Sequence, residues 1–100
     1  MEGYNKLVRD KVPEYLDSKG ILYEKRVANP EEYKEELFKK LDEEIKEFIE
    51  AKNTEELADV LEVIEAIKKL PEFQKVEEVR KEKLEEKGGF DNKIILKGEK

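Results

Sequence analysis

The sequence predicts a single, mainly α-helical domain built on a helical hairpin, of the kind found in four-helix bundles. Apolar residues recur at the i, i+3 and i+4 positions of an amphipathic helix over two long segments. The break between these segments is very short, which favours an antiparallel pair of helices. The chain has 100 residues and shows no repeat or linker, so residues 1–100 are expected to form one domain.

The residues before the hairpin predict one short helix and one short strand. Asp10 is the expected N-cap of the helix, with Pro13 at its third position and Gly20 as its C-terminal stop. Residues 21–27 alternate imperfectly between apolar and polar side chains, which indicates a short strand. Residues 93–97 indicate another, and the two could pair as a ribbon at the edge of the helices.

The two hairpin helices are expected over about residues 31–52 and 55–70. Asn29 is the predicted N-cap of the first, with Pro30 at its first position and Glu32 completing a capping box. Its apolar stripe consists of Tyr33, Leu37, Phe38, Leu41, Ile45, Phe48 and Ile49. Thr54 is the predicted N-cap of the second helix, whose apolar residues are Leu57, Val60, Leu61, Val63, Ile64, Ile67 and Leu70. The second helix is apolar over roughly half its circumference, which predicts a homodimer or a larger homo-oligomer.

Composition excludes several classes of function. The chain is 48% charged with a net charge of -6, which argues against binding a nucleic-acid polymer over a broad surface. It has no Cys and no His, so catalysis would depend on Asp, Glu, Lys, Arg, Tyr or a hard metal ion. No apolar run approaches the roughly 18 residues that span a membrane, and no secretion signal is apparent. A cytoplasmic location is therefore expected, and the abundance of Lys and Glu is typical of thermophiles.

Four carboxylates lean toward the interior of the predicted hairpin. With successive residues about 100° apart around a helix, Glu44 lies about 60° and Glu47 about 120° from the centre of the first stripe. Glu56 lies inside the apolar face of the second helix, and Asp59 lies at its border. Each acid alone could simply pair with a lysine at the rim. The four together would repel one another, and a hard divalent cation such as Mg²⁺ or Mn²⁺ would relieve that repulsion.

Two groups of cations are candidates for binding an anion. A last helix is expected between Pro71 and Gly88-Gly89, and its apolar face also carries Arg80, Lys83 and Lys87. These side chains could cover the core with their aliphatic stems, but three aligned cations fit better with a facing phosphate. Lys6, Arg9 and Lys11 precede the first helix and could reach the same anion or merely solvate the N-terminus.

The acidic pattern resembles that of a known superfamily. The run Glu43-Glu44-Ile45-Lys46-Glu47, followed by Glu56-Leu57-Ala58-Asp59, is similar to the two-part signature of the all-α nucleoside triphosphate pyrophosphohydrolases, which include MazG. Residues 4–13, 56–64, 80–83 and 88–90 resemble a small MazG-like subgroup often named for phosphoribosyl-ATP. The resemblance implies cleavage of the α–β phosphate bond of a nucleotide, release of pyrophosphate, and Mg²⁺ held by Glu44, Glu47, Glu56 and Asp59.

One departure affects this implied ligand set. Only eight residues separate Glu47 from Glu56, fewer than is usual in the superfamily, so Glu43 or Glu62 could substitute as ligands. Neither the nucleotide nor the carboxylate that acts as general base follows from the sequence. The alternatives to an enzyme are a non-catalytic oligomeric helical binding module and a nucleotide-binding protein without turnover.

Overall fold

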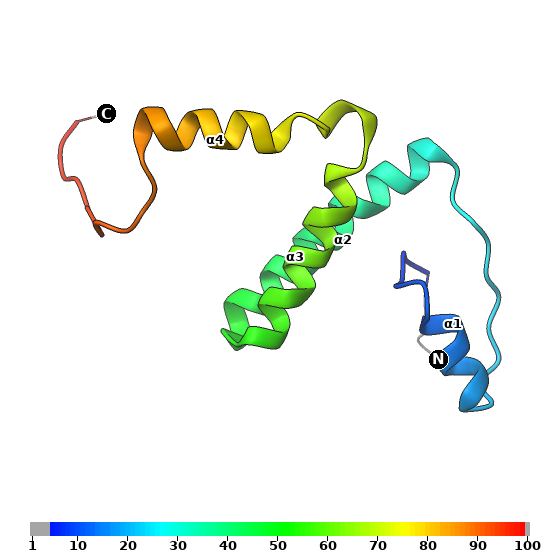
Figure 1. The fold of residues 1–100 in the computed structure, drawn as a ribbon. Helices are drawn as coiled ribbons and strands as arrows, with labels where there is room; N and C mark the ends of the chain where they lie inside the picture. Colours follow the sequence, from blue (N-terminus) through cyan, green and yellow to red (C-terminus); the bar gives the residue numbers. More distant parts are fainter. Residues whose placement is uncertain (1–4, 100) are drawn as a thin grey trace.

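The protein is mainly helical, as predicted. The structure, a computed structural model, describes residues 5–99 (Figure 1). Its elements in chain order are α1 (Val12–Ser18), α2 (Pro30–Ala51), α3 (Thr54–Lys68), the 3-10 helix η1 (Pro71–Phe73) and α4 (Val76–Lys87). No helix among these is long and apolar enough to cross a membrane.

The antiparallel hairpin of α2 and α3 is the centre of the fold (Figure 1). The Asn29 side chain accepts a hydrogen bond of 2.9 Å from the Glu32 backbone N–H, and so caps α2 as predicted. The Glu32 carboxylate accepts a hydrogen bond of 2.6 Å from Arg26, and this bond, together with a weaker one from the Asn29 backbone N–H, lowers the pKa of Glu32, as expected for a capping box.

The turn between α2 and α3 consists of two residues, Lys52 and Asn53. Lys52 adopts a left-handed conformation with φ of 52°, and its N–H donates to the Phe48 carbonyl. Asn53 is extended, and its side chain accepts a hydrogen bond of 2.9 Å from the Glu56 backbone N–H. The prediction that Thr54 caps this helix is therefore wrong. Asn53 occupies the cap, and Thr54 is the first helical residue.

Few apolar side chains are buried. Leu37 of α2 and Val60 and Val63 of α3 are buried, as is Leu16 of α1. At one end of the hairpin, the Phe73 ring lies edge-on to Phe38, with ring centroids 6.3 Å apart. The chain therefore buries a narrow core along a two-helix pair.

The segment before the hairpin differs from its prediction in two ways. Lys11 precedes α1 and no side chain caps the helix, so Asp10 is not the N-cap, and Pro13 occupies the second helical position rather than the third. Residues 21–27 and 93–97 contain no strand, and the predicted ribbon is wrong. The two segments lie on opposite sides of the structure, the first beside α1 and the second beyond α4 (Figure 1).

α4 projects away from the hairpin (Figure 1). Pro71 opens η1 rather than α4, which begins only at Val76 and ends before Gly88, a residue with φ of 78°. The start of this arm is anchored by an ion pair of 2.9 Å between Lys68 and Glu77. Every side chain of α4 is exposed.

Candidate metal centre

Three of the four predicted acids converge on one side of the hairpin. Glu44 comes from the middle of α2, and Glu56 and Asp59 come from the first turns of α3. One carboxylate oxygen from each of the three lies within 4.8 Å of the others. The Asn53 cap fixes the start of α3, and antiparallel packing brings this start back alongside α2. The hairpin is therefore what gathers acids from separate parts of the sequence.

Glu44 is buried although its side chain is ionisable, with 7% of its surface exposed. The Lys40 ammonium lies 3.4 Å from Oε1 of Glu44, and Oε2 has no hydrogen-bond partner among residues 5–99. Oε2 of Glu56 is likewise buried without a partner. An unsatisfied buried polar atom costs about 1–3 kcal/mol. Burial raises the pKa of Glu44, and the neighbouring charge of Glu47 raises it further, while Lys40 opposes both effects.

The remaining candidate acids lie outside this cluster of three carboxylates. Glu47 follows Glu44 by one turn of α2 and is exposed, although it is near enough for its charge to act on Glu44. Glu43 points toward Lys6, whose hydrogen bond lowers the pKa of this carboxyl group. Glu62 is exposed on α3 and does not join the group. Neither Glu43 nor Glu62 therefore replaces a member of the cluster in this arrangement.

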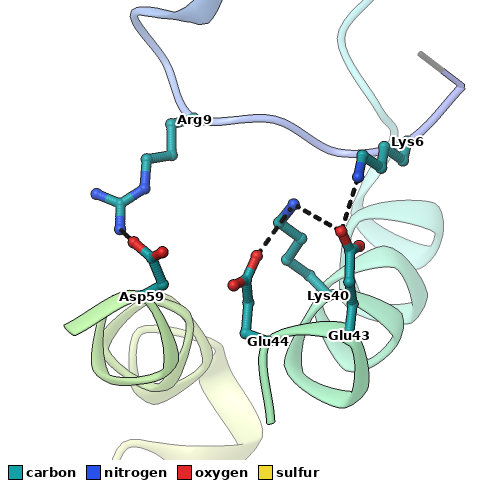
Figure 2. Close-up of polar contacts among 6 residues, drawn as sticks. All are labelled: Lys6, Arg9, Lys40, Glu43, Glu44 and Asp59. Carbon is teal, nitrogen blue, oxygen red and sulfur yellow. Dashed lines mark hydrogen bonds and ion pairs between the residues drawn. The ribbon is translucent and has the colours of Figure 1, made fainter. Parts of the chain in front are cut away.

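The segment before α1 lies across the acids and contributes two cations (Figure 2). Arg9 donates a hydrogen bond of 2.7 Å to Oδ1 of Asp59, and Lys6 donates one of 2.7 Å to Oε1 of Glu43. Between this segment and the hairpin is an open cavity of about 240 Å³. It is lined by Lys6, Val8, Arg9, Val12, Lys40, Glu44 and Asp59. The cavity thus has carboxylates at its base and cations at its rim.

Sequence reasoning left Lys40 out of the site. Lys40 precedes Glu44 by four residues, a spacing that places two side chains on the same face of a helix. Its ammonium lies between Glu43 and Glu44, 3.7 Å and 3.4 Å from their carboxylates (Figure 2). A search for a cation four residues from each acid that leans toward the core would have identified Lys40.

The other predicted cations lie elsewhere. Lys11 is exposed and does not line the cavity. Arg80 pairs with Glu77 on its own helix, through hydrogen bonds of 2.7 Å and 3.1 Å. Lys83 and Lys87 are exposed on the arm formed by α4, which leads away from the hairpin (Figure 1). Among the residues that the structure describes, Lys6, Arg9 and Lys40 face the acids, and the cations of α4 lie apart from them.

Comparisons of the chain with protein-family models, with curated proteins and with solved structures find no match. The described residues define an acidic pocket with a cationic rim, open to solvent on one face of a helical hairpin.

Proposed function

We propose that the protein is a Mg²⁺-dependent nucleotide pyrophosphohydrolase, which cleaves the α–β phosphate bond of a nucleoside triphosphate or related nucleotide and releases pyrophosphate. The observation that carries the proposal is the buried, unpartnered Oε2 of Glu44 beside Glu56 and Asp59, beneath a rim of cations. The carboxylates at the bottom of the pocket suit a hard cation, and the Lys and Arg side chains around its edge suit a phosphate. The two together favour a metal-bound nucleotide over either ligand alone.

The donor set fits a hard divalent cation. All of its donors are carboxylate oxygens, the ligands that Mg²⁺ and Mn²⁺ prefer. Three carboxylate oxygens within 4.8 Å repel one another, and a cation at this position would offset that repulsion and satisfy both unpartnered oxygens. Glu44, Glu56 and Asp59 are the proposed ligands, and Glu47 is the proposed fourth. A bound cation would neutralise phosphate charge and lower the pKa of a bound water molecule.

The remaining residues would hold the substrate. Arg9 presents a guanidinium group that can bind two phosphate oxygens at once, and Lys6 and Lys40 present point charges on the same cavity. These cations compensate for a chain whose net charge of -6 would otherwise repel a polyphosphate. A cluster carboxylate would orient the attacking water and accept its proton. Arg80, Lys83 and Lys87 would reach phosphate only from another copy of the chain.

The test is pyrophosphate release from a panel of nucleotides with Mg²⁺ and without it. We expect release only with Mg²⁺, and a loss of at least about 100-fold for Asp59→Asn or Glu56→Gln, as when a group that stabilises the transition state is removed. The matched control is Glu62→Gln, an exposed carboxylate on the same helix, which should retain activity. Nucleotide binding without release from any member of the panel would contradict the proposal and favour a binding protein.

A further inference from the structure

The cavity above the acids is lined by charged groups and by two small apolar side chains. Three of its seven lining residues are cations and two are carboxylates, and the remaining two are Val8 and Val12. Among residues 5–99, the lining includes no aromatic ring and no amide or hydroxyl side chain. Proteins recognise a nucleobase by stacking it on aromatic rings and by hydrogen bonds to its edges. The charged groups therefore match the phosphates of a nucleotide, and no lining side chain matches its base.

Aromatic rings that stack on a base in other proteins lie away from this cavity. Phe38 and Phe73 pack on each other at one end of the hairpin, with ring centroids 6.3 Å apart. The Lys19 ammonium lies over the Tyr15 ring, 5.6 Å from its centroid. Phe90 is 96% exposed, on the loop that follows α4. None of these rings lines the cavity.

The cavity is also small for a whole nucleotide. Its volume is about 240 Å³, whereas pockets that enclose a drug-sized organic ligand have about 300–1,000 Å³. The hairpin forms its base, and the segment before α1 lies across it (Figure 2). Because the cavity is open to solvent, a nucleotide whose phosphates meet the acids' metal ion and the three cations leaves its base outside.

We propose that the site recognises the triphosphate group alone, and that it therefore also hydrolyses inorganic tripolyphosphate, a triphosphate with no organic group. The inference rests on the proposed function, which supplies the metal ion and the phosphate-binding role of Lys6, Arg9 and Lys40. Water attacks a terminal phosphorus atom, its proton passes to a carboxylate of the cluster, and the bond from that phosphorus to the bridging oxygen breaks. The products are orthophosphate and pyrophosphate. The leaving group is the same as in nucleotide hydrolysis, so the same cations hold it.

The expected selectivity for the organic group is low. A site that offers only apolar contact discriminates between substrates by about 10–200-fold, whereas a site built to hydrogen-bond a group rejects analogues without it by about 10⁴–10⁵-fold. Val8 and Val12 offer apolar contact only. We therefore expect kcat/KM to differ by less than about tenfold among nucleobases, and by less than about 200-fold between a nucleotide and tripolyphosphate.

The test is a series of triphosphates from which the organic group is removed in steps. Its members are the common nucleoside triphosphates, ribose 5-triphosphate, which has no base, and inorganic tripolyphosphate. We expect Mg²⁺-dependent release of pyrophosphate from every member. Tripolyphosphate should also inhibit nucleotide hydrolysis competitively, with an inhibition constant equal to its own KM. Asp59→Asn should reduce release from every member by at least about 100-fold, and Glu62→Gln should preserve it.

The outcomes separate this inference from the proposed function. A fall in kcat/KM of about 10⁴-fold or more at one step would show that the site recognises the group removed at that step. That result would overturn the inference and leave the proposed function intact, as would tripolyphosphate that is neither cleaved nor competitive while nucleotides are hydrolysed. If no member of the series is hydrolysed, both proposals fail.

A second measurement does not depend on how well a variant folds, because it compares two substrates in one sample. Lys6→Met and Lys40→Met each remove a cation from the cavity. Each should lower kcat/KM for a nucleotide and for tripolyphosphate by the same factor, because both substrates carry the phosphates that these cations hold. The control is Lys39→Met, an exposed lysine of α2 paired with Glu36, which should leave both values unchanged. A loss confined to nucleotides would show that the cations contact sugar or base and would overturn the inference.

Discussion

At Glu44, one carboxylate oxygen faces the Lys40 ammonium while the other has no partner. The helical angle of this residue predicted that it leans inward, because burial on a regular helix follows from position in the sequence. Its pairing with Lys40 was predictable from the same geometry. The contact between Arg9 and Asp59 was not, because it joins residues 50 positions apart and no local pattern encodes it.

Arg9 and a metal ion would compete for Asp59. In Arg9→Met, Mg²⁺ no longer has to displace a guanidinium group, so we expect a given Mg²⁺ concentration to raise the melting temperature more than in the wild type. The metal-free variant should lose less than about 1 kcal/mol of stability, because both partners of the ion pair are largely exposed. Nucleotide binding should weaken at the same time, because a phosphate ligand is lost.

The control for this experiment is Arg26→Met, which removes an exposed ion pair with Glu32 away from the pocket. Its response to Mg²⁺ should match that of the wild type. If Arg9→Met and Arg26→Met respond alike, then Asp59 is not shared between the arginine and the metal.

Each of the hairpin helices is capped by an asparagine side chain, and the two caps differ in what they position. Asn29→Ala and Asn53→Ala should each destabilise the fold by about 1 kcal/mol, measured by urea unfolding. Only Asn53 holds the backbone of Glu56, a proposed metal ligand. We therefore expect Asn53→Ala to reduce the stabilisation by Mg²⁺ and Asn29→Ala to preserve it. Equal responses to Mg²⁺ would show that the cap does not position the site.

The attachment of α4 should depend on pH through Glu77. Hydrogen bonds from Arg80 and then Lys68 lower the pKa of Glu77 from 4.5 to about 2. A lowered pKa in the folded state stabilises the structure above pH 4.5, and this contribution is lost as the pH falls toward 2. The protection of α4 amides from hydrogen exchange, taken relative to the intrinsic exchange rate at each pH, should fall over this range in the wild type. In Glu77→Gln this protection should be low already at neutral pH, whereas Glu78→Gln should behave like the wild type.

The sequence predicted the helices better than their surroundings. Two apolar stripes and the Asn29 cap were enough to place α2 and α3 to within about two residues, because helix formation depends on residues three and four apart. The predicted ribbon was wrong because residues 21–27 and 93–97 had to meet across most of the chain, and no local signal tests such a contact. The confusion of Thr54 with Asn53 as the N-cap was an error of one residue between two good capping side chains.

Over the whole molecule, sequence reasoning missed the placement of the outer segments. It proposed that the cations of the last helix face a phosphate bound near the acids, and it left open whether Lys6, Arg9 and Lys11 reach the same anion or only solvate the N-terminus. In the structure α4 departs from the hairpin after η1, and the rim of the pocket comes from the segment before α1 (Figures 1 and 2). Helical periodicity shows which face of α4 is apolar, but it does not show what lies against that face.

The turn of two residues at Lys52 and Asn53 limits how this protein can change in length during evolution. Inserting one residue there, with helix propagation maintained, would rotate Glu56 and Asp59 by about 100° around α3 relative to Glu44. The carboxylates would no longer converge. Insertions of about seven residues, roughly one helical turn in each of the two helices, would turn the carboxylates of α3 back toward Glu44. Natural variants of the hairpin should therefore differ in length by whole pairs of helical turns, with the spacing between the two acidic motifs changing in the same steps.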